Sequence, residues 1–267
     1  MPVQPVPFFS GALYARKSCF VYLPSSYEST DREYPVVYLL HGMYGSESDW
    51  LLKGNAEATL NRMMEAGELG ESIVVFPNDG GYGQGTFYID WYDGTGNFEQ
   101  YIVDDLVPFI DETFRTIKDK KYRYVGGLSM GGFGAFSLAL RKPDVFGAAA
   151  SLSGALGSLR LMPYPNFARS EFPRMFGPRH GERVQSHDLL LLTAALQTSG
   201  ERPHLYFDCG KEDYLYEYNA AFNRHLDEIR YPHLYTEYTG EHNWAYWTEH
   251  LPDALRFFET CRVEAGL

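Results

Sequence analysis

The chain has 267 residues, of which 45% are hydrophobic and 16% aromatic, a composition that supports one α/β domain spanning residues 1–267. Its formal net charge of −12 repels phosphate backbones and anionic lipid, so neither nucleic acid nor a membrane is an expected partner. The three cysteines, Cys19, Cys209 and Cys261, are too few and too scattered for a disulfide framework or a zinc site.

The N-terminal segment has no recognisable targeting signal. Met1-Pro-Val-Gln-Pro-Val-Pro7 has neither a basic region nor an apolar core of the kind that opens a signal peptide. No run in the sequence approaches the roughly 18 apolar residues of a membrane-spanning helix. We therefore expect a cytoplasmic protein.

The first half of the chain alternates between predicted strands and helices. Residues 18–23 form an early strand that we expect to be antiparallel, and Cys19 lies in it as a buried thiol. The apolar runs 34–40 and 72–77 are typical of strands buried on both faces of a parallel sheet. Between them, residues 56–66 form an amphipathic helix that ends at the following glycines.

A glycine-containing loop, His41-Gly-Met-Tyr-Gly45, follows the strand 34–40 directly. Loops at the carboxyl ends of central strands form the ligand sites of α/β sheets. The backbone N–H of Met43 can therefore point into a site as a donor to a developing oxyanion. We interpret His41 as a loop-shaping residue that bonds backbone, not as a catalytic base.

A long loop with many aromatic residues follows the strand 72–77. Residues 78–85 are rich in glycine but lack the G-K-[ST] ending of a phosphate-binding loop. The aromatic stretch 86–92 fits two interpretations equally well, a wall of the substrate site or a flap packed on the core. Residues 97–114 then predict one long helix, with Asp104, Asp105, Asp111 and Glu112 on a solvated face or in helix pairs.

The strongest functional signal is the segment 122–136, a short strand, a glycine-crowded turn and a helix. Gly127-Leu-Ser-Met-Gly131 at its centre matches the G-x-S-x-G nucleophile elbow. Glycines on either side of Ser129 remove side chains that would block a strained strand-to-helix turn. The N–H of Met130, at the start of the helix, is the second predicted oxyanion donor.

The second half returns to the same alternation after an irregular stretch. Residues 155–200 are dense in prolines and aromatics, and we interpret them as a short insertion that caps the site. Its aromatic residues fit either an apolar acyl pocket or a surface for a homo-oligomer. The remaining predicted elements are the strands 146–154, 204–209 and 233–238 and the helices 218–229 and 252–262, which argues for a mainly parallel sheet with helices on both faces.

Two later residues complete the constellation that a serine nucleophile requires. A serine hydroxyl needs a base to take its proton, and the base needs an acid to orient it. Asp213 and His242 each follow one of the last two strands, in the chain order Ser, acid, His. Glu212 is the alternative acid, whereas Asp208 lies inside the strand and is expected to bond backbone or a neighbouring loop.

Four ordered blocks resemble the putative-esterase branch of the α/β-hydrolases. They are Leu39-Leu-His-Gly-Met43, Gly126-Gly-Leu-Ser-Met-Gly-Gly132, Cys209-Gly-Lys-Glu-Asp213 and Gly240-Glu-His-Asn-Trp244. That branch includes esterase D (S-formylglutathione hydrolase), tributyrin-type esterases, feruloyl esterases and the antigen 85 mycolyltransferases. The resemblance implies Ser129 as nucleophile, Asp213 as acid, His242 as base, and the amides of Met43 and Met130 as the oxyanion hole.

The residues and the resemblance together predict a cofactor-free, metal-free serine carboxylesterase. Its expected substrate is a small-molecule ester with a short or aromatic acyl group. Two alternatives stay open at the level of sequence. The same site can transfer the acyl group to an alcohol or sugar instead of water, and a hydrolase scaffold can serve a non-enzymatic binding protein.

Overall fold

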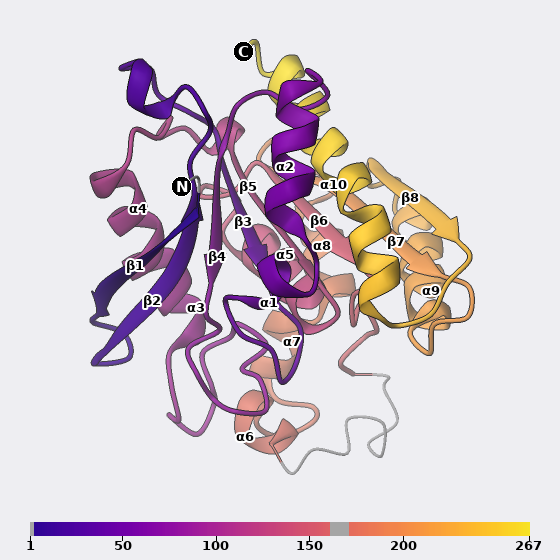
Figure 1. Ribbon diagram of the computed structural model, residues 1–267. Helices are drawn as coiled ribbons and strands as arrows, with labels where there is room; N and C mark the ends of the chain where they lie inside the picture. Colours follow the sequence, from indigo (N-terminus) through magenta and orange to yellow (C-terminus); the bar gives the residue numbers. More distant parts are fainter. Residues whose placement is uncertain (1–2, 161–170) are drawn as a thin grey trace.

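The computed structural model describes residues 3–160 and 171–267, and within them the strands form one eight-stranded sheet (Figure 1). Its spatial order is β1-β2-β4-β3-β5-β6-β7-β8, and every pair from β4 onward is parallel. The strands are β1 (Val3–Ser10), β2 (Ala15–Tyr22), β3 (Val36–Leu40), β4 (Ile73–Pro77), β5 (Arg123–Leu128), β6 (Ala148–Leu152), β7 (His204–Gly210) and β8 (His233–Tyr238).

Helices cover both faces of this sheet. The α-helices are α1 (Asp49–Leu52), α2 (Ala56–Glu65), α3 (Phe98–Gln100), α4 (Val107–Thr113), α5 (Met130–Arg141), α6 (Phe172–Phe176), α7 (Glu182–His187), α8 (Leu189–Leu196), α9 (Tyr216–Glu228) and α10 (Trp244–Glu264). Short 3-10 turns lie at η1 (Tyr27–Ser29) and η3 (Lys120–Tyr122). Helices α2 and α10 run together over one face (Figure 1), and α5, α8 and α9 contribute to the core on the other. The predicted mainly parallel sheet with helices on both faces is confirmed.

The central strands are apolar throughout because each contributes to two separate cores. In β3, Val36, Tyr38 and Leu40 pack in the cluster that contains α5. Val37 and Leu39 point to the opposite face and pack with α2 and α10. A strand alternates its side chains between faces, so a strand covered on both sides needs an uninterrupted apolar run.

The first strand, β1, was not predicted from the sequence. β1 spans Val3–Ser10 although it contains Pro5 and Pro7, and it pairs antiparallel with β2. Proline lacks the N–H that a ladder needs, but β1 is the edge of the sheet, where one side of the strand has no partner strand. The prolines are tolerated for that reason.

The predicted single helix over 97–114 is interrupted. It begins as α3, passes through a π-helical segment η2 (Tyr101–Leu106) and continues as α4. Pro108, which has no N–H to donate, follows this segment at the start of α4.

The predicted solvated carboxylates on this helix include two with tertiary partners. Asp111 forms a buried ion pair with Arg123 at the start of β5, with 2.5 Å between Arg123 Nη2 and Asp111 Oδ2. Asp105 accepts hydrogen bonds from the Ser10 hydroxyl and from the backbone N–H of Ala12, at 2.5 and 2.9 Å. These two carboxylates fasten the helix to the sheet and to the β1–β2 hairpin, so the predicted solvated face was wrong for them.

The last helix begins eight residues before its predicted start. α10 starts at Trp244, and its N-cap Asn243 accepts a hydrogen bond from the backbone N–H of Tyr246 at 3.1 Å. Pro252 lies inside the helix. A proline is favoured at a first helical position, and that preference misled the prediction. The extra turns bring Trp247 into the functional site.

The irregular stretch 155–200 contains α6, α7 and α8, while the predicted insertion residues Pro163, Tyr164, Pro165 and Phe167 lie outside the described residues. α8 lies on the crossover from β6 to β7, a connection that parallel strands require. α6 is tied to the aromatic loop by Arg174, whose guanidinium donates to Asp93, Tyr82 and Thr95.

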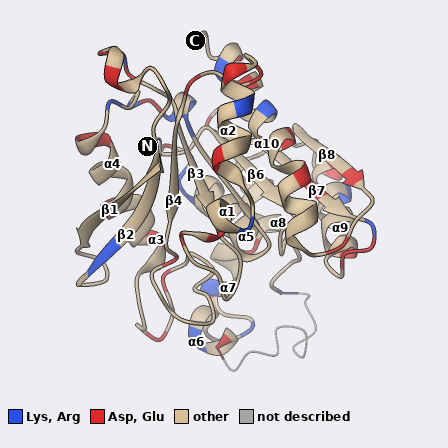
Figure 2. Ribbon diagram, in the orientation of Figure 1, with Lys and Arg blue, Asp and Glu red and all other residues tan. Residues whose placement is uncertain are grey.

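Acidic and basic residues are interspersed along the outer helices α2 and α10 (Figure 2). Arg256 on α10 pairs with Glu68, just after α2, and with Asp253 one turn away. Within residues 3–160 and 171–267, no helix is both long and apolar enough to cross a membrane.

Candidate active site

Ser129 lies on a strained turn between β5 and α5. Its backbone has φ 53° and ψ −116°, a combination that a residue with a side chain rarely adopts. Backbone hydrogen bonds hold the turn: Ser129 N–H donates to Leu152 O at 3.0 Å, and Ser129 O accepts from the N–H groups of Gly132, Phe133 and Ala155 at 3.1, 3.2 and 3.2 Å. The turn presents a partly exposed serine hydroxyl at the carboxyl edge of the sheet.

The positions on either side of Ser129 must be glycine, because main-chain atoms of neighbouring residues lie where a side chain would begin. A Cβ at Gly131 would lie 2.5 Å from Leu40 O and 2.7 Å from His41 O. A Cβ at Gly127 would lie 2.5 Å from the carbonyl of Gly131. These neighbours are main-chain atoms, which cannot rotate out of the way.

Replacing Gly131 with alanine is expected to lower the free energy of unfolding by about 2 kcal/mol, because overpacking typically costs 1–3 kcal/mol and exceeds the gain of up to about 1 kcal/mol in helix propensity. Urea unfolding of the variant measures this. The matched control is Gly83→Ala, where a Cβ would meet no heavy atom within 4 Å. Its expected effect is below about 0.5 kcal/mol. Equal stability of the two variants would contradict the steric explanation.

The structure brings Ser129, Asp213 and His242 together. His242 Nε2 lies 2.9 Å from Ser129 Oγ, and His242 Nδ1 lies 2.7 Å from Asp213 Oδ2. A carboxylate only accepts hydrogen bonds, so Nδ1 carries the proton and donates to Asp213, while Nε2 accepts from the serine hydroxyl. The Asp213 side chain is fully buried and that of His242 is 14% exposed.

Backbone contacts hold the loops that carry Asp213 and His242 against each other. Gly210 and Gly240 approach so closely that a Cβ on Gly210 would lie 2.0 Å from Gly240 O. Glu212 N–H donates to Gly240 O at 3.2 Å, and the Glu212 carboxylate accepts from Gly240 N–H at 2.6 Å. Glu212, the alternative acid, is thus a brace between the two loops, and Asp213 alone of the pair bonds His242.

Asp208 does not bond backbone or a loop through its side chain, contrary to expectation. Its two carboxylate oxygens accept from the hydroxyls of Tyr246 and Tyr206, at 2.8 and 2.9 Å. Burial raises the pKa of Asp208 to about 7, against the opposing effect of the two tyrosine hydrogen bonds. Tyr246 lies in the first turn of α10 and packs against Gly240, so Asp208 anchors the segment that carries His242.

The raised pKa of Asp208 predicts a pH dependence of stability. A carboxyl that ionises less readily when folded stabilises the fold below its unfolded pKa of about 3.9, and this contribution is lost as pH rises toward 7. The difference in unfolding free energy between wild type and Asp208→Asn should therefore fall by up to about 4 kcal/mol between pH 4 and pH 8. Urea unfolding at both pH values measures it, and a difference independent of pH would contradict the prediction.

The two predicted oxyanion donors flank Ser129. Met130 follows it directly, and Gly42, next to Met43, approaches so closely that a Cβ there would lie 3.5 Å from Ser129 Cβ. Both methionine side chains meet at Gly85, where a Cβ would lie 2.5 Å from Met130 Sδ and 3.3 Å from Met43 Cγ. Within the described residues, no hydrogen bond occupies the backbone N–H of Met43 or Met130.

The aromatic loop is mainly a flap packed on the core. Phe87, Tyr88 and Trp91 are all buried, and Tyr88 donates a hydrogen bond from its hydroxyl to His41 O at 3.0 Å. His41 is itself buried, and its Nδ1 lies 2.8 Å from Gly42 O. His41 thus shapes the loop that carries Met43, as expected.

Two aromatic residues beside His242 were not singled out from the sequence. The ring centroid of Trp247 lies 4.9 Å from that of His242, with the planes perpendicular, and the ring of Tyr214 lies 4.6 Å away on a tilted plane. Trp247 is buried and Tyr214 is 70% exposed. Their proximity in sequence to His242 and Asp213 was the available signal.

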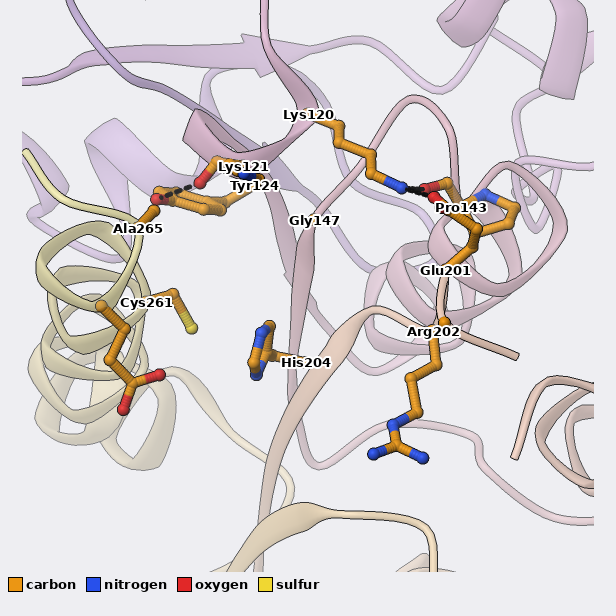
Figure 3. Close-up of a pocket in the computed structure, with 12 residues that line it drawn as sticks. Lys120, Lys121, Tyr124, Pro143, Gly147, Glu201, Arg202, His204, Cys261 and Ala265 are labelled. Atoms are coloured by element: carbon orange, nitrogen blue, oxygen red, sulfur yellow. Dashed lines mark hydrogen bonds and ion pairs between the residues drawn. The ribbon is translucent and has the colours of Figure 1, made fainter. Parts of the chain in front are cut away.

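A pocket of about 410 Å³ (Figure 3) lies at the end of the sheet opposite Ser129. Lys120, His204 and Cys261 are among the residues that line it, at the amino ends of β5 and β7 and near the end of α10. Burial raises the pKa of the Cys261 thiol to about 12, so it stays protonated and unreactive at neutral pH. This pocket shares no residue with the Ser129 site. All three cysteines are free and buried, as predicted for Cys19.

Comparisons with known proteins identify the family of this chain. The family model described as "Putative esterase" matches residues 10–258. An acetyl esterase from Caldicellulosiruptor saccharolyticus is 24% identical over 273 residues, covering 96% of this chain and 98% of the relative. An endo-1,4-beta-xylanase/feruloyl esterase from Xylanibacter ruminicola is 34% identical over 161 residues, 57% of this chain. The aligned part is 21% of that longer protein.

Solved structures extend the similarity to the whole fold. A ferulic acid esterase superposes with a TM-score of 0.83 at 28% identity, covering 97% of this chain and 98% of the other. An S-formylglutathione hydrolase from Agrobacterium tumefaciens superposes with a TM-score of 0.81 at 18% identity, covering 97% and 94% of the two chains. The second likeness concerns the fold alone. The family match over residues 10–258 spans most of the chain, which therefore belongs to the Putative esterase family of the α/β-hydrolases and is an ester hydrolase.

Proposed function

We propose that the protein is a serine carboxylesterase that hydrolyses short-chain acyl or aromatic acyl esters through an acyl-enzyme on Ser129. The observation that carries the proposal is the hydrogen-bonded chain from Asp213 through His242 to Ser129, with distances of 2.7 and 2.9 Å. Such a chain supplies the base that a serine hydroxyl lacks at neutral pH.

The first half of the reaction forms the acyl-enzyme. His242 Nε2 takes the proton of Ser129 as Oγ attacks the ester carbonyl carbon. The negative charge that develops on the carbonyl oxygen is held by the N–H groups of Met43 and Met130, assisted by the positive end of the α5 dipole. Asp213 stabilises the imidazolium. His242 then gives the proton to the leaving alkoxide, and the ester C–O bond breaks.

The second half of the reaction releases the acid. Water gives a proton to His242 Nε2 and attacks the acyl carbon, and the tetrahedral intermediate collapses with the proton returned to Ser129 Oγ. Over the two halves His242 accepts and returns a proton in each, and Ser129 regains its hydroxyl at the end. The site therefore needs no cofactor. The buried Asp213 keeps Nδ1 protonated and Nε2 free to act throughout.

The proposed acyl groups follow from the relatives. The acetyl esterase and the ferulic acid esterase are named for a short and an aromatic acyl group, respectively. We propose the same two classes for the small-molecule ester substrate of this chain.

The test is hydrolysis of p-nitrophenyl acetate, butyrate and octanoate and of methyl ferulate, with a fluorophosphonate label located by peptide mass spectrometry. We expect turnover of the acetate or the ferulate and one label per chain, on Ser129. Labelling of another residue would contradict the mechanism. An inert protein with an unreactive Ser129 would favour a binding role, and an alcohol acceptor consumed in preference to water would favour acyl transfer.

A further inference from the structure

An exposed tyrosine stands beside the imidazole of the site. Tyr214 follows Asp213 in the chain, and its ring lies 4.6 Å from the ring of His242 with 51° between the planes. The side chain is 70% exposed, which is unusual for a large ring so close to buried catalytic groups. Trp247, the other ring against His242, is buried and perpendicular to it. Of these two aromatic neighbours, Tyr214 is the one that a bound molecule can reach.

The backbone under Tyr214 is held in place by the turn around Asp213. Asp213 N–H donates to Gly210 O at 3.1 Å, and Asp213 O accepts from Tyr216 N–H at 3.0 Å. The Asp213 carboxylate also accepts from Leu215 N–H at 2.7 Å. A ring mounted on a fixed backbone loses little conformational entropy when a ligand packs on it.

The proton transfer from His242 to the leaving oxygen indicates which part of the substrate lies against the Tyr214 ring. In the proposed mechanism, on which this inference rests, the leaving oxygen takes its proton from His242 Nε2 and so lies within about 3 Å of it. The carbon skeleton of the alcohol therefore starts beside the imidazole. Because Trp247 closes the buried side, the alcohol extends along the exposed side, where Tyr214 stands.

We propose that Tyr214 is a specificity-determining residue for the leaving alcohol, and that it favours alcohols whose ring presents a flat face to stack on. Aromatic rings and the C–H faces of pyranose rings share this chemistry. A small alkyl alcohol such as ethanol offers no such face and gains nothing from Tyr214.

The test compares three acetates of primary alcohols: ethyl acetate, benzyl acetate and methyl 6-O-acetyl-glucopyranoside. They share the acyl group and the acyl-enzyme, so the ratio of kcat/KM for a ring ester to that for ethyl acetate cancels any change in the Ser129 machinery. In Tyr214→Ala we expect this ratio to fall about fivefold, the size of one aromatic stacking contact. Tyr214→Phe keeps the ring and should keep the ratio.

The matched control is Tyr14→Ala, which removes a tyrosine that is 89% exposed in the β1–β2 hairpin. The inference is supported if the kcat/KM ratio falls in Tyr214→Ala but not in Tyr14→Ala. Whether it falls for the benzyl ester, the glucopyranoside ester or both tells which ring is bound. An unchanged ratio, or an equal fall in Tyr14→Ala, overturns it. If the wild type hydrolyses neither these acetates nor methyl ferulate, the proposed function fails too. If it acts only on ferulates, the same ratio is measured with the ferulates of the three alcohols. Turnover with an unchanged ratio contradicts only the role of Tyr214.

Discussion

Ser129→Ala is expected to lower kcat for p-nitrophenyl acetate by a factor of about 10⁴ or more, with the fold intact. In the proposed mechanism the nucleophile, base and acid act as a unit, so removal of the nucleophile abolishes the acyl-enzyme route and leaves only what binding and the oxyanion donors contribute. The hydroxyl of Ser129 accepts no backbone hydrogen bond at the start of α5, so its loss should barely change the unfolding free energy. Steady-state kinetics and urea unfolding of the same preparation separate the two effects.

The matched control for this variant is Ser151→Ala on the neighbouring strand β6. The Ser151 hydroxyl is buried and has no hydrogen-bond partner in the described structure, so its removal should change kcat by less than about twofold. The fluorophosphonate label should be lost in Ser129→Ala and kept in Ser151→Ala. Persistence of the label in Ser129→Ala would show that another residue is the nucleophile.

Asp213→Asn is expected to lower kcat by about 10³- to 10⁴-fold. In the proposed mechanism the carboxylate holds the proton on His242 Nδ1, and it stabilises the imidazolium that forms as Ser129 is activated. An asparagine can donate its amide N–H to Nδ1, which stabilises the tautomer with the proton on Nε2. In that tautomer His242 cannot accept the proton of Ser129, although the shape of the site is unchanged. The pre-steady-state burst of p-nitrophenol measures acylation directly and should slow by the same factor as kcat.

The neighbouring carboxylate supplies the control. Glu212 accepts from Gly240 N–H at 2.6 Å, a bond that the amide oxygen of glutamine can also accept. Glu212→Gln should therefore retain kcat within about threefold, since an exposed, charge-assisted hydrogen bond contributes little more than a neutral one. A larger loss in Glu212→Gln than in Asp213→Asn would reverse the assignment of the acid.

Most of the fold could be predicted because its central strands and helices have unambiguous local patterns. The run Val36–Leu40 is apolar at every position, and Ala56–Glu65 repeats near the helical period, so each was located to within two residues. The errors lie where tertiary position overrides local preference. Pro5 and Pro7 argue against a strand unless the strand is known to be an edge, and Pro252 argues for a helix start unless the Asn243 cap is recognised.

The members of the candidate site were also identified in advance, because each follows a predicted parallel strand and such loops gather at one edge of a sheet. The side chains that contact these site residues were not predicted from the sequence. Nothing local pairs Asp208 with Tyr206 and Tyr246, places the rings of Trp247 and Tyr214 beside His242, or buries Asp111 against Arg123. These contacts join residues from separate elements, and their existence depends on how α10 and the π-helical segment pack on the sheet.

By itself, the amino-acid sequence determined the α/β class, the G-x-S-x-G turn around Ser129 and the chain order of Ser129, Asp213 and His242. These are local properties, since apolar runs, glycine spacing and turn positions are readable within a few residues. Only the tertiary structure decided that His242 lies between Asp213 and Ser129 at hydrogen-bonding distance, that Glu212 braces the loops instead of orienting the base, and that Tyr214 stays exposed beside the imidazole. Distances between segments that are 29 to 113 residues apart are set by packing across the sheet, which no local pattern encodes.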